Sequence, residues 1–232
     1  MKSRIFFIGL VISLSIIQSS NAGVSPLNSQ ELIQKYPSIG QDSKRPEDKK
    51  ILCPYLRLIE RSGLFDSEKL KSEPELIVSI RKLLNGVKDF GLRYFAGRTA
   101  ATAVSIGQST SGTSKLGKVN LHSLHTAKGI AHECGLTFGY KETTINTNVR
   151  KNTLNRLKAI SIDGKLSLDN MLKIKEEICI AQGVKASFAG KGEVALIFKF
   201  LGGNDNGFVY YNDVELFLNG YMPMTKSKGY FF

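Results

Sequence analysis

The chain has 232 residues, with 32 basic and 20 acidic side chains, so its net charge at neutral pH is +12. Its three cysteines are too few for a scaffold built on disulfides, and a chain of this length can bury a core without them. The lysines are scattered among acidic residues and form no dense tract with aromatic residues, so we do not expect nucleic acid as a partner.

Residues 1–22 have the layout of a secretory signal peptide. Lys2 and Arg4 precede an apolar run over 5–17, and polar residues then lead to a small-residue site ending at Ala22. We expect cleavage after Ala22, which removes two basic and no acidic residues and lowers the net charge from +12 to +10. A membrane anchor is the alternative, but the run is short for a membrane span and no later stretch is apolar enough for one. The mature protein is therefore expected to be secreted or extracytoplasmic.

The remaining chain predicts one mostly α domain at 51–232, preceded by an irregular segment at 23–50 that is polar and contains three prolines. A helix is expected to start at Pro54 and to end near Gly63. Apolar residues at helical spacing predict further helices, at 73–87, 120–130, 152–162, 167–181 and 210–218. The stretch 97–117 is rich in Gly, Ser, Thr and Ala, which predicts a loop or a closely packed small-residue backbone. The apolar run 193–201 fits either a strand or a buried helix.

Two patterns that suggest metal sites are incomplete. With Gly207 as the sixth residue of a calcium loop, Gly202 would stand at the first ligand position, where a carboxylate is needed, so 202–207 is better explained as a turn. The three histidines, His122, His125 and His132, lie close together along the chain, but a zinc site needs a second ligand pair, which does not follow downstream. Histidines of the core or of a cleft are the simpler interpretation.

Cys53 stands directly before Pro54, at the expected start of a helix. Free backbone N–H groups and the positive end of the helix dipole favour a thiolate at that position, and proline suits the first helical turn. Such a thiolate is a suitable axial ligand for haem iron. A buried structural thiol is the alternative for a cysteine–proline pair taken by itself. For Cys134 and Cys179 we expect either a disulfide or two buried thiols.

Four segments of the chain resemble, in the same order, the motifs of the haem-thiolate peroxidases, the chloroperoxidase and peroxygenase family. They are Cys53-Pro54 with the helix ending in Gly63-Leu64, Asn120-Leu121 leading into Ala131-His132-Glu133, Gly192-Glu193 followed by Leu201-Gly202, and Gly220-Tyr221-Met222-Pro223 with Gly229-Tyr230 after it. The resemblance covers 45–230. It implies a chloroperoxidase-like helical domain that binds haem b, with Cys53 as the axial ligand of the iron. It also implies that Glu193 is the distal acid–base and that His132 assists or orients Glu193.

The chain departs from the family pattern at several of these positions. Ala131 stands where the family has the glutamate that helps to bind a magnesium or manganese ion beside a haem propionate, so this accessory ion is not expected. The closing motif is degraded, and Ala186 falls where longer members carry an arginine paired with the distal glutamate.

The resemblance therefore implies an exported haem-thiolate peroxidase or peroxygenase, which would use hydrogen peroxide to oxidise a small organic substrate or a halide. Two alternatives stay open. One is a catalytically weakened or non-enzymatic secreted protein that binds haem or a partner on the same scaffold. The other is a basic exported adhesion or nucleic-acid-binding module.

Overall fold

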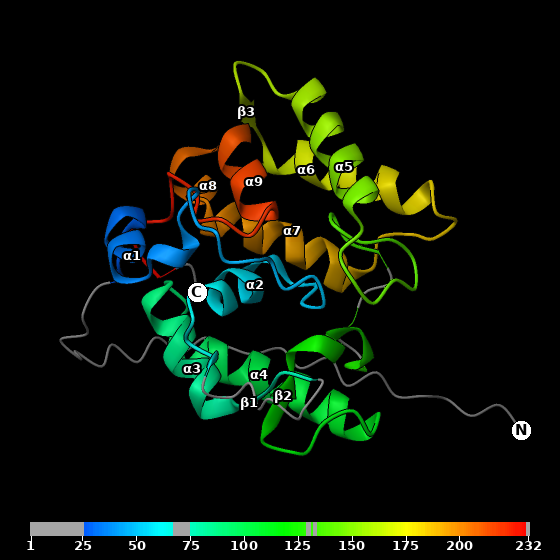
Figure 1. Ribbon diagram of the computed structural model, residues 1–232. Coiled ribbons are helices and arrows are strands. Elements are labelled where there is room, and N and C mark those ends of the chain that lie inside the picture. Colours follow the sequence, from blue (N-terminus) through cyan, green and yellow to red (C-terminus); the bar gives the residue numbers. More distant parts are fainter. Residues whose placement is uncertain (1–25, 67–74, 129–130, 132–133, 231–232) are drawn as a thin grey trace, which may run out of the picture.

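The computed structural model describes residues 26–66, 75–128, 131 and 134–230, and this part of the chain is mostly helical, which confirms the predicted fold class (Figure 1). The longer helices are α2 (Pro54–Arg61), α3 (Ile80–Asp89), α4 (Tyr94–Thr110), α5 (Thr147–Ile160), α6 (Leu168–Ile180), α7 (Phe188–Phe200) and α9 (Tyr211–Leu218). The short helical segments are α1 (Ser29–Lys35), η1 (Pro37–Ile39), η3 (Leu121–Thr126) and α8 (Gly203–Asn206). None of the helices in these ranges is long and apolar enough to cross a membrane.

Two short antiparallel ribbons complete the described structure. Strand β1 (Ile77–Ser79) pairs with β2 (Lys118–Asn120), so that Val78 lies opposite Val119. Strand β3 (Lys165–Leu166) pairs with β4 (Val209–Tyr210), with Leu166 opposite Val209. Each ribbon joins segments that are far apart in the chain, and each buries an apolar pair against the core.

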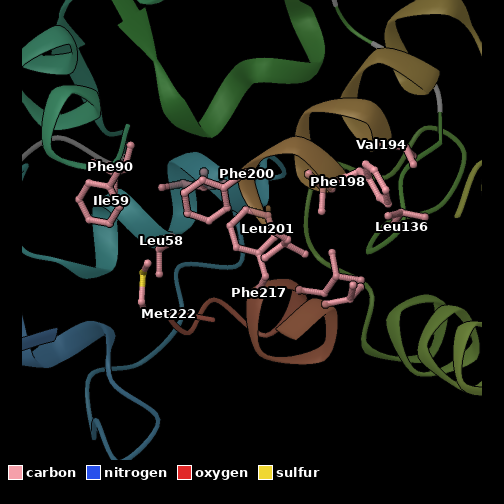
Figure 2. Packing of buried hydrophobic residues seen from close by; sticks show 14 of the residues in the cluster. Leu58, Ile59, Phe90, Leu136, Val194, Phe198, Phe200, Leu201, Phe217 and Met222 are labelled. Carbon is pink, nitrogen blue, oxygen red and sulfur yellow. The ribbon is translucent and has the colours of Figure 1, made fainter. Parts of the chain in front are cut away.

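Helix α2 lies between two groups of elements: α3, α4 and the β1–β2 ribbon on one side, and α5 to α9 on the other (Figure 1). Its Leu58 and Ile59 are fully buried, and they lie in the same cluster as Phe200 of α7 and Phe217 of α9 (Figure 2). The Phe200 and Phe217 rings are 5.0 Å apart between centroids, a distance typical of favourable aromatic packing. The apolar core thus holds α2 firmly against the helices that follow it by more than a hundred residues in the chain.

The expectation of an irregular segment over 23–50 is wrong in part, because this segment contains α1 and η1. The Asn28 side chain accepts the Glu31 N–H, and the Glu31 carboxylate accepts the Asn28 N–H, which forms a capping box at the start of α1. Leu32 and Ile39 have no exposed surface and belong to the main core. A helix of seven residues is too short to give a clear apolar period, so the capping residues were its only signal in the sequence.

The stretch 97–117 is not a loop over most of its length, because α4 is the longest helix described and extends to Thr110. Its small residues are instead used for close packing. A Cβ atom at Gly107 would lie 2.9 Å from the backbone N and O of Lys128, and one at Gly97 would lie 3.2 Å from Leu84. Because small residues give no strong amphipathic period, the sequence pattern does not reveal a helix that packs closely along one side.

The other predicted elements differ from the structure mainly at their boundaries. The helix expected at 73–87 begins later, after β1, because Ser79 caps α3 by accepting the Lys82 N–H. The helix expected at 120–130 is a short 3₁₀ segment, η3, interrupted at Ser123. The run 193–201 is helical, and the predicted turn at 202–207 contains the single turn α8 between Gly202 and Gly207, both with positive φ.

Candidate functional site

Cys53 lies at the N-cap of α2, as the sequence predicts. Its backbone is extended, with φ −71° and ψ 116°, and Pro54 occupies the first helical position. The predicted end of this helix is also confirmed, because Gly63 has a φ of +84°, a conformation that suits glycine.

The thiol of Cys53 is the only free one among the three cysteines. Cys134 and Cys179 form a disulfide whose Cα atoms are 5.8 Å apart, so the bridged alternative is correct for this pair. Cys53 therefore remains available as a ligand or reactive group, and the residue keeps partial exposure to solvent.

Opposing effects act on the ionisation of Cys53. Burial raises the pKa of the thiol to about 11, and the negative charge of Glu193 acts in the same direction. The backbone N–H groups of Leu56 and Tyr55 lower the pKa, as does the charge of Arg57. The helix start therefore favours the thiolate, as expected, but burial outweighs it and the free thiol is protonated at neutral pH.

Arg57 is one turn beyond Cys53 and is fully buried in a cluster of charged side chains. Its Nε lies 2.9 Å from Glu47 Oε1, and the same oxygen is 2.6 Å from Arg150 Nη1. Arg57 also donates to the carbonyl oxygen of Ile51 at 3.0 Å and to that of Leu218 at 2.9 Å. Burial lowers the pKa of Arg57 to about 10, and Glu47 opposes this effect, so the guanidinium stays charged at neutral pH.

These contacts fix the segment that carries Cys53. The Arg57 guanidinium donates to the carbonyl oxygens of both Ile51 and Leu52. It therefore fixes the backbone directly before Cys53. Arg57 thus has two effects on the thiol: it supplies positive charge beside it, and it orients the chain that approaches α2.

Glu193 lies in α7, and its side chain is 14% exposed. It comes near enough to α2 for its charge to raise the pKa of Cys53 and to act on Arg57. The fold therefore places the thiol and the carboxylate that the sequence motifs indicate within electrostatic range of each other, on helices more than a hundred residues apart in the chain.

Lys175 of α6 is a residue of this site that the sequence analysis missed. Its side chain has no exposed surface, and its Nζ lies 3.4 Å from Glu193 Oε2. A lysine in an amphipathic helix is normally taken as solvent-facing. A signal was present nonetheless, because Lys175 stands one turn from both Met171 and Cys179, in the buried stripe of α6.

The histidines are placed differently from one another. His132 lies outside the described residues, so its pairing with Glu193 stays a prediction. The Leu76 N–H donates to His122 Nδ1 at 3.2 Å, and His122 Nε2 lies 2.9 Å from Asp48 Oδ2. Both ring nitrogens of His122 thus have protein partners, which indicates a structural role in joining the N-terminal segment to η3.

Among the residues that the structure describes, no group of three His, Cys, Asp or Glu side chains is close enough to hold a metal ion. A single thiolate is a sufficient protein ligand for a haem iron, so Cys53 is the donor to consider. Comparisons of this chain with protein-family models, with curated proteins and with solved structures gave no match.

Proposed function

We propose that this protein is an exported haem-thiolate peroxidase or peroxygenase, which uses hydrogen peroxide to oxidise a small organic substrate or a halide. The observation that carries the proposal is the electrostatic coupling between Cys53, the only free thiol, and Glu193 of α7. The order of the sequence motifs assigns these same two residues to the axial ligand and the acid–base of the haem-thiolate family. Neither assignment depends on the structure, so the electrostatic effect of Glu193 on the Cys53 thiol is independent support.

The surroundings of Cys53 suit a thiolate ligand of haem b. The backbone N–H groups of Tyr55 and Leu56 and the Arg57 charge stabilise negative charge on sulfur, and Pro54 fixes the entry into α2. With a pKa of about 11 the free thiol is protonated at neutral pH, so binding of a haem iron by Cys53 would require loss of that proton. When bound, haem supplies the oxidising chemistry, and a thiolate ligand favours cleavage of the O–O bond.

Glu193 is suited to move the proton that peroxide cleavage requires. A carboxylate can accept a proton from one peroxide oxygen and return it to the oxygen that leaves as water. Partial burial at 14% exposure limits exchange of that proton with bulk water. The predicted role of His132 is to orient this carboxylate. We expect no accessory magnesium or manganese ion, because Ala131 has no carboxylate.

A second function is favoured by Ala131. Residue 131 has no carboxylate and is exposed to solvent, whereas the family uses a glutamate there. A secreted protein that binds haem or a partner without turnover would tolerate this loss. The two functions differ in whether peroxide is consumed.

The experiment that separates them measures haem content and turnover on the same mature protein. We expect one haem b per chain in a pyridine haemochrome assay and peroxide-dependent oxidation of small phenols or halide. Glu193→Gln should keep the haem and lower turnover by about 100-fold or more, because it removes the acid–base group. Glu215→Gln in α9 is the matched control and should retain the activity. Haem loading with no turnover in the unaltered protein would support the second function. A failure to take up haem would contradict the peroxidase function and leave only the partner-binding form of the second.

A further inference from the structure

The ammonium group of Lys175 is completely buried at the contact between α6 and α7. Its side chain has 0% exposure, and burying an ammonium group is costly unless charged or polar partners surround it. Two such partners are present: the Cys134 carbonyl oxygen at 2.7 Å and Glu193 Oε2 at 3.4 Å. An apolar side chain would fill this part of the core without that cost, so the charge itself calls for an explanation.

Helix α7 has a glycine, Gly190, at the point where the Lys175 side chain packs against it. Gly190 stands one turn before Glu193, and a Cβ atom there would lie 3.2 Å from Lys175 Cε and 3.5 Å from Nζ. Contacts of 3.2 Å are tighter than most Cβ atoms tolerate. The missing side chain at Gly190 thus leaves the path along which Lys175 reaches the carboxylate.

The other partner of Lys175, the carbonyl of Cys134, belongs to a residue that a disulfide links to α6. Cys134 is bridged to Cys179, which follows Lys175 by one turn on the same face of α6. The disulfide therefore ties the segment that carries the Cys134 carbonyl to α6, beside the ammonium group that donates to it. Lys175 Nζ thus lies 2.7 Å from a carbonyl oxygen on one side and 3.4 Å from the Glu193 carboxylate on the other.

We propose that Lys175 is the positioning residue of Glu193, whose buried positive charge holds the carboxylate in the orientation needed for proton transfer. This inference rests on the proposed acid–base function of Glu193. Lys175 acts through Glu193 and does not itself meet the peroxide. The ion pair Lys191–Glu176 joins the same two helices at the surface, at 3.0 Å with 51% and 32% exposure, and has no such role.

A double-mutant cycle tests whether Lys175 acts through Glu193. Lys175→Met removes the charge and keeps the length of the side chain. In the haem-loaded protein it should lower the rate constant for the reaction with hydrogen peroxide by about 10- to 100-fold. In the Glu193→Gln background the same change should have almost no further effect. Lys191→Met, the matched control, should leave the rate unchanged in both backgrounds. An equal loss from Lys175→Met in both backgrounds would overturn the proposal, since a purely structural lysine behaves in that way.

A second measurement needs no haem and no variant of the buried lysine. In the haem-free protein, nitrogen-15 labelled at lysine Nζ should show a Lys175 ammonium signal protected from exchange with water. Glu193→Gln should shift this signal, and Glu176→Gln should not. An unchanged Lys175 signal in Glu193→Gln would overturn the pairing even if Lys175→Met failed to fold. Because this measurement is independent of haem, its failure differs from a failure of the proposed function, which would appear as absent haem or absent turnover.

Discussion

At the scale of single residues, the chemistry of this interior is determined by which charges lie beside Cys53. The thiol is drawn toward its neutral form by burial and by Glu193, and toward its ionised form by Arg57 and the amides of α2. These opposing effects raise the pKa of Cys53 from its ordinary value of 9.0 to about 11. The carboxylate and the thiol thus influence each other before any ligand is bound.

The first prediction concerns this coupling in the haem-free protein. Glu193→Gln removes a negative charge that raises the Cys53 pKa, so the pKa of the thiol should be lower in this variant than in the unaltered protein. The rate of alkylation by iodoacetamide as a function of pH reports this pKa, and Cys53 is the only free thiol that can react. Glu176→Gln, at the α6–α7 surface, should leave the pH dependence of Cys53 alkylation unchanged. An unchanged titration in Glu193→Gln would show that the two groups do not interact.

At the scale of secondary-structure elements, the sequence predicts those helices whose apolar residues recur strongly. Helix α6 is an example: it begins after its N-cap Ser167, and its buried Met171, Ile174 and Ile178 follow the predicted stripe. Helix α4 was missed because its buried positions are small or polar residues such as Gly97, Ala101, Ser105 and Gln108. Such a helix is stabilised by close packing against neighbouring segments. The residues of the helix do not indicate which segment of the chain packs against it.

Close approach also explains why part of the site escaped prediction. The sequence motifs identify Cys53 and Glu193, whose residue types carry the chemistry. Lys175 is recognisable only when α6 and α7 are seen in contact, since its role depends on Gly190 across the helix interface. The position of Lys175 one turn from Met171 and Cys179 indicates that its side chain is buried, but it does not indicate Glu193 as its partner.

The second prediction tests the packing of α4. Gly107→Ala should lower the free energy of unfolding by roughly 1–3 kcal/mol, because the new Cβ would lie 2.9 Å from backbone atoms of Lys128 and the backbone would have to shift. Gly192→Ala is the matched control within a helix, with nothing within 4 Å of its added Cβ. It should be neutral or stabilise the protein by up to about 1 kcal/mol, through better helix propensity. Urea denaturation of the two variants measures both effects. Equal stability of both variants would mean that α4 does not approach the 127–128 segment closely.

At the scale of the whole molecule, one buried charge cluster joins segments from along the whole described chain. Glu47 of the N-terminal segment contacts Arg57 of α2 and Arg150 of α5, and both arginines donate to the Leu218 carbonyl at the end of α9. The side chains of Arg57 and Glu47 are 0% and 10% exposed. The N-terminal segment is therefore part of the domain, and the position of Cys53 depends on contacts with three other elements.

The third prediction follows from this cluster. Glu47→Gln leaves two buried arginines without their shared counter-ion, and it should lower the free energy of unfolding by about 3–5 kcal/mol. Glu177→Gln removes the partner of Arg156 in a pair that is 39% and 40% exposed, and it should change stability by less than about 1 kcal/mol. Thermal or urea unfolding at neutral pH measures both variants. A Glu47→Gln protein as stable as Glu177→Gln would contradict the assigned importance of the cluster.

The central claim is that Cys53 is the thiolate ligand of a haem, and the absorption spectrum of the ferrous–carbon monoxide complex tests it most directly. For the unaltered mature protein we expect the strongly red-shifted band that is typical of thiolate ligation. Cys53→Ala should abolish this band, and Cys53→His should replace it with the band of an imidazole-ligated haem. A haem complex whose carbon monoxide spectrum lacks the red-shifted band, or retains it in Cys53→Ala, would contradict the claim.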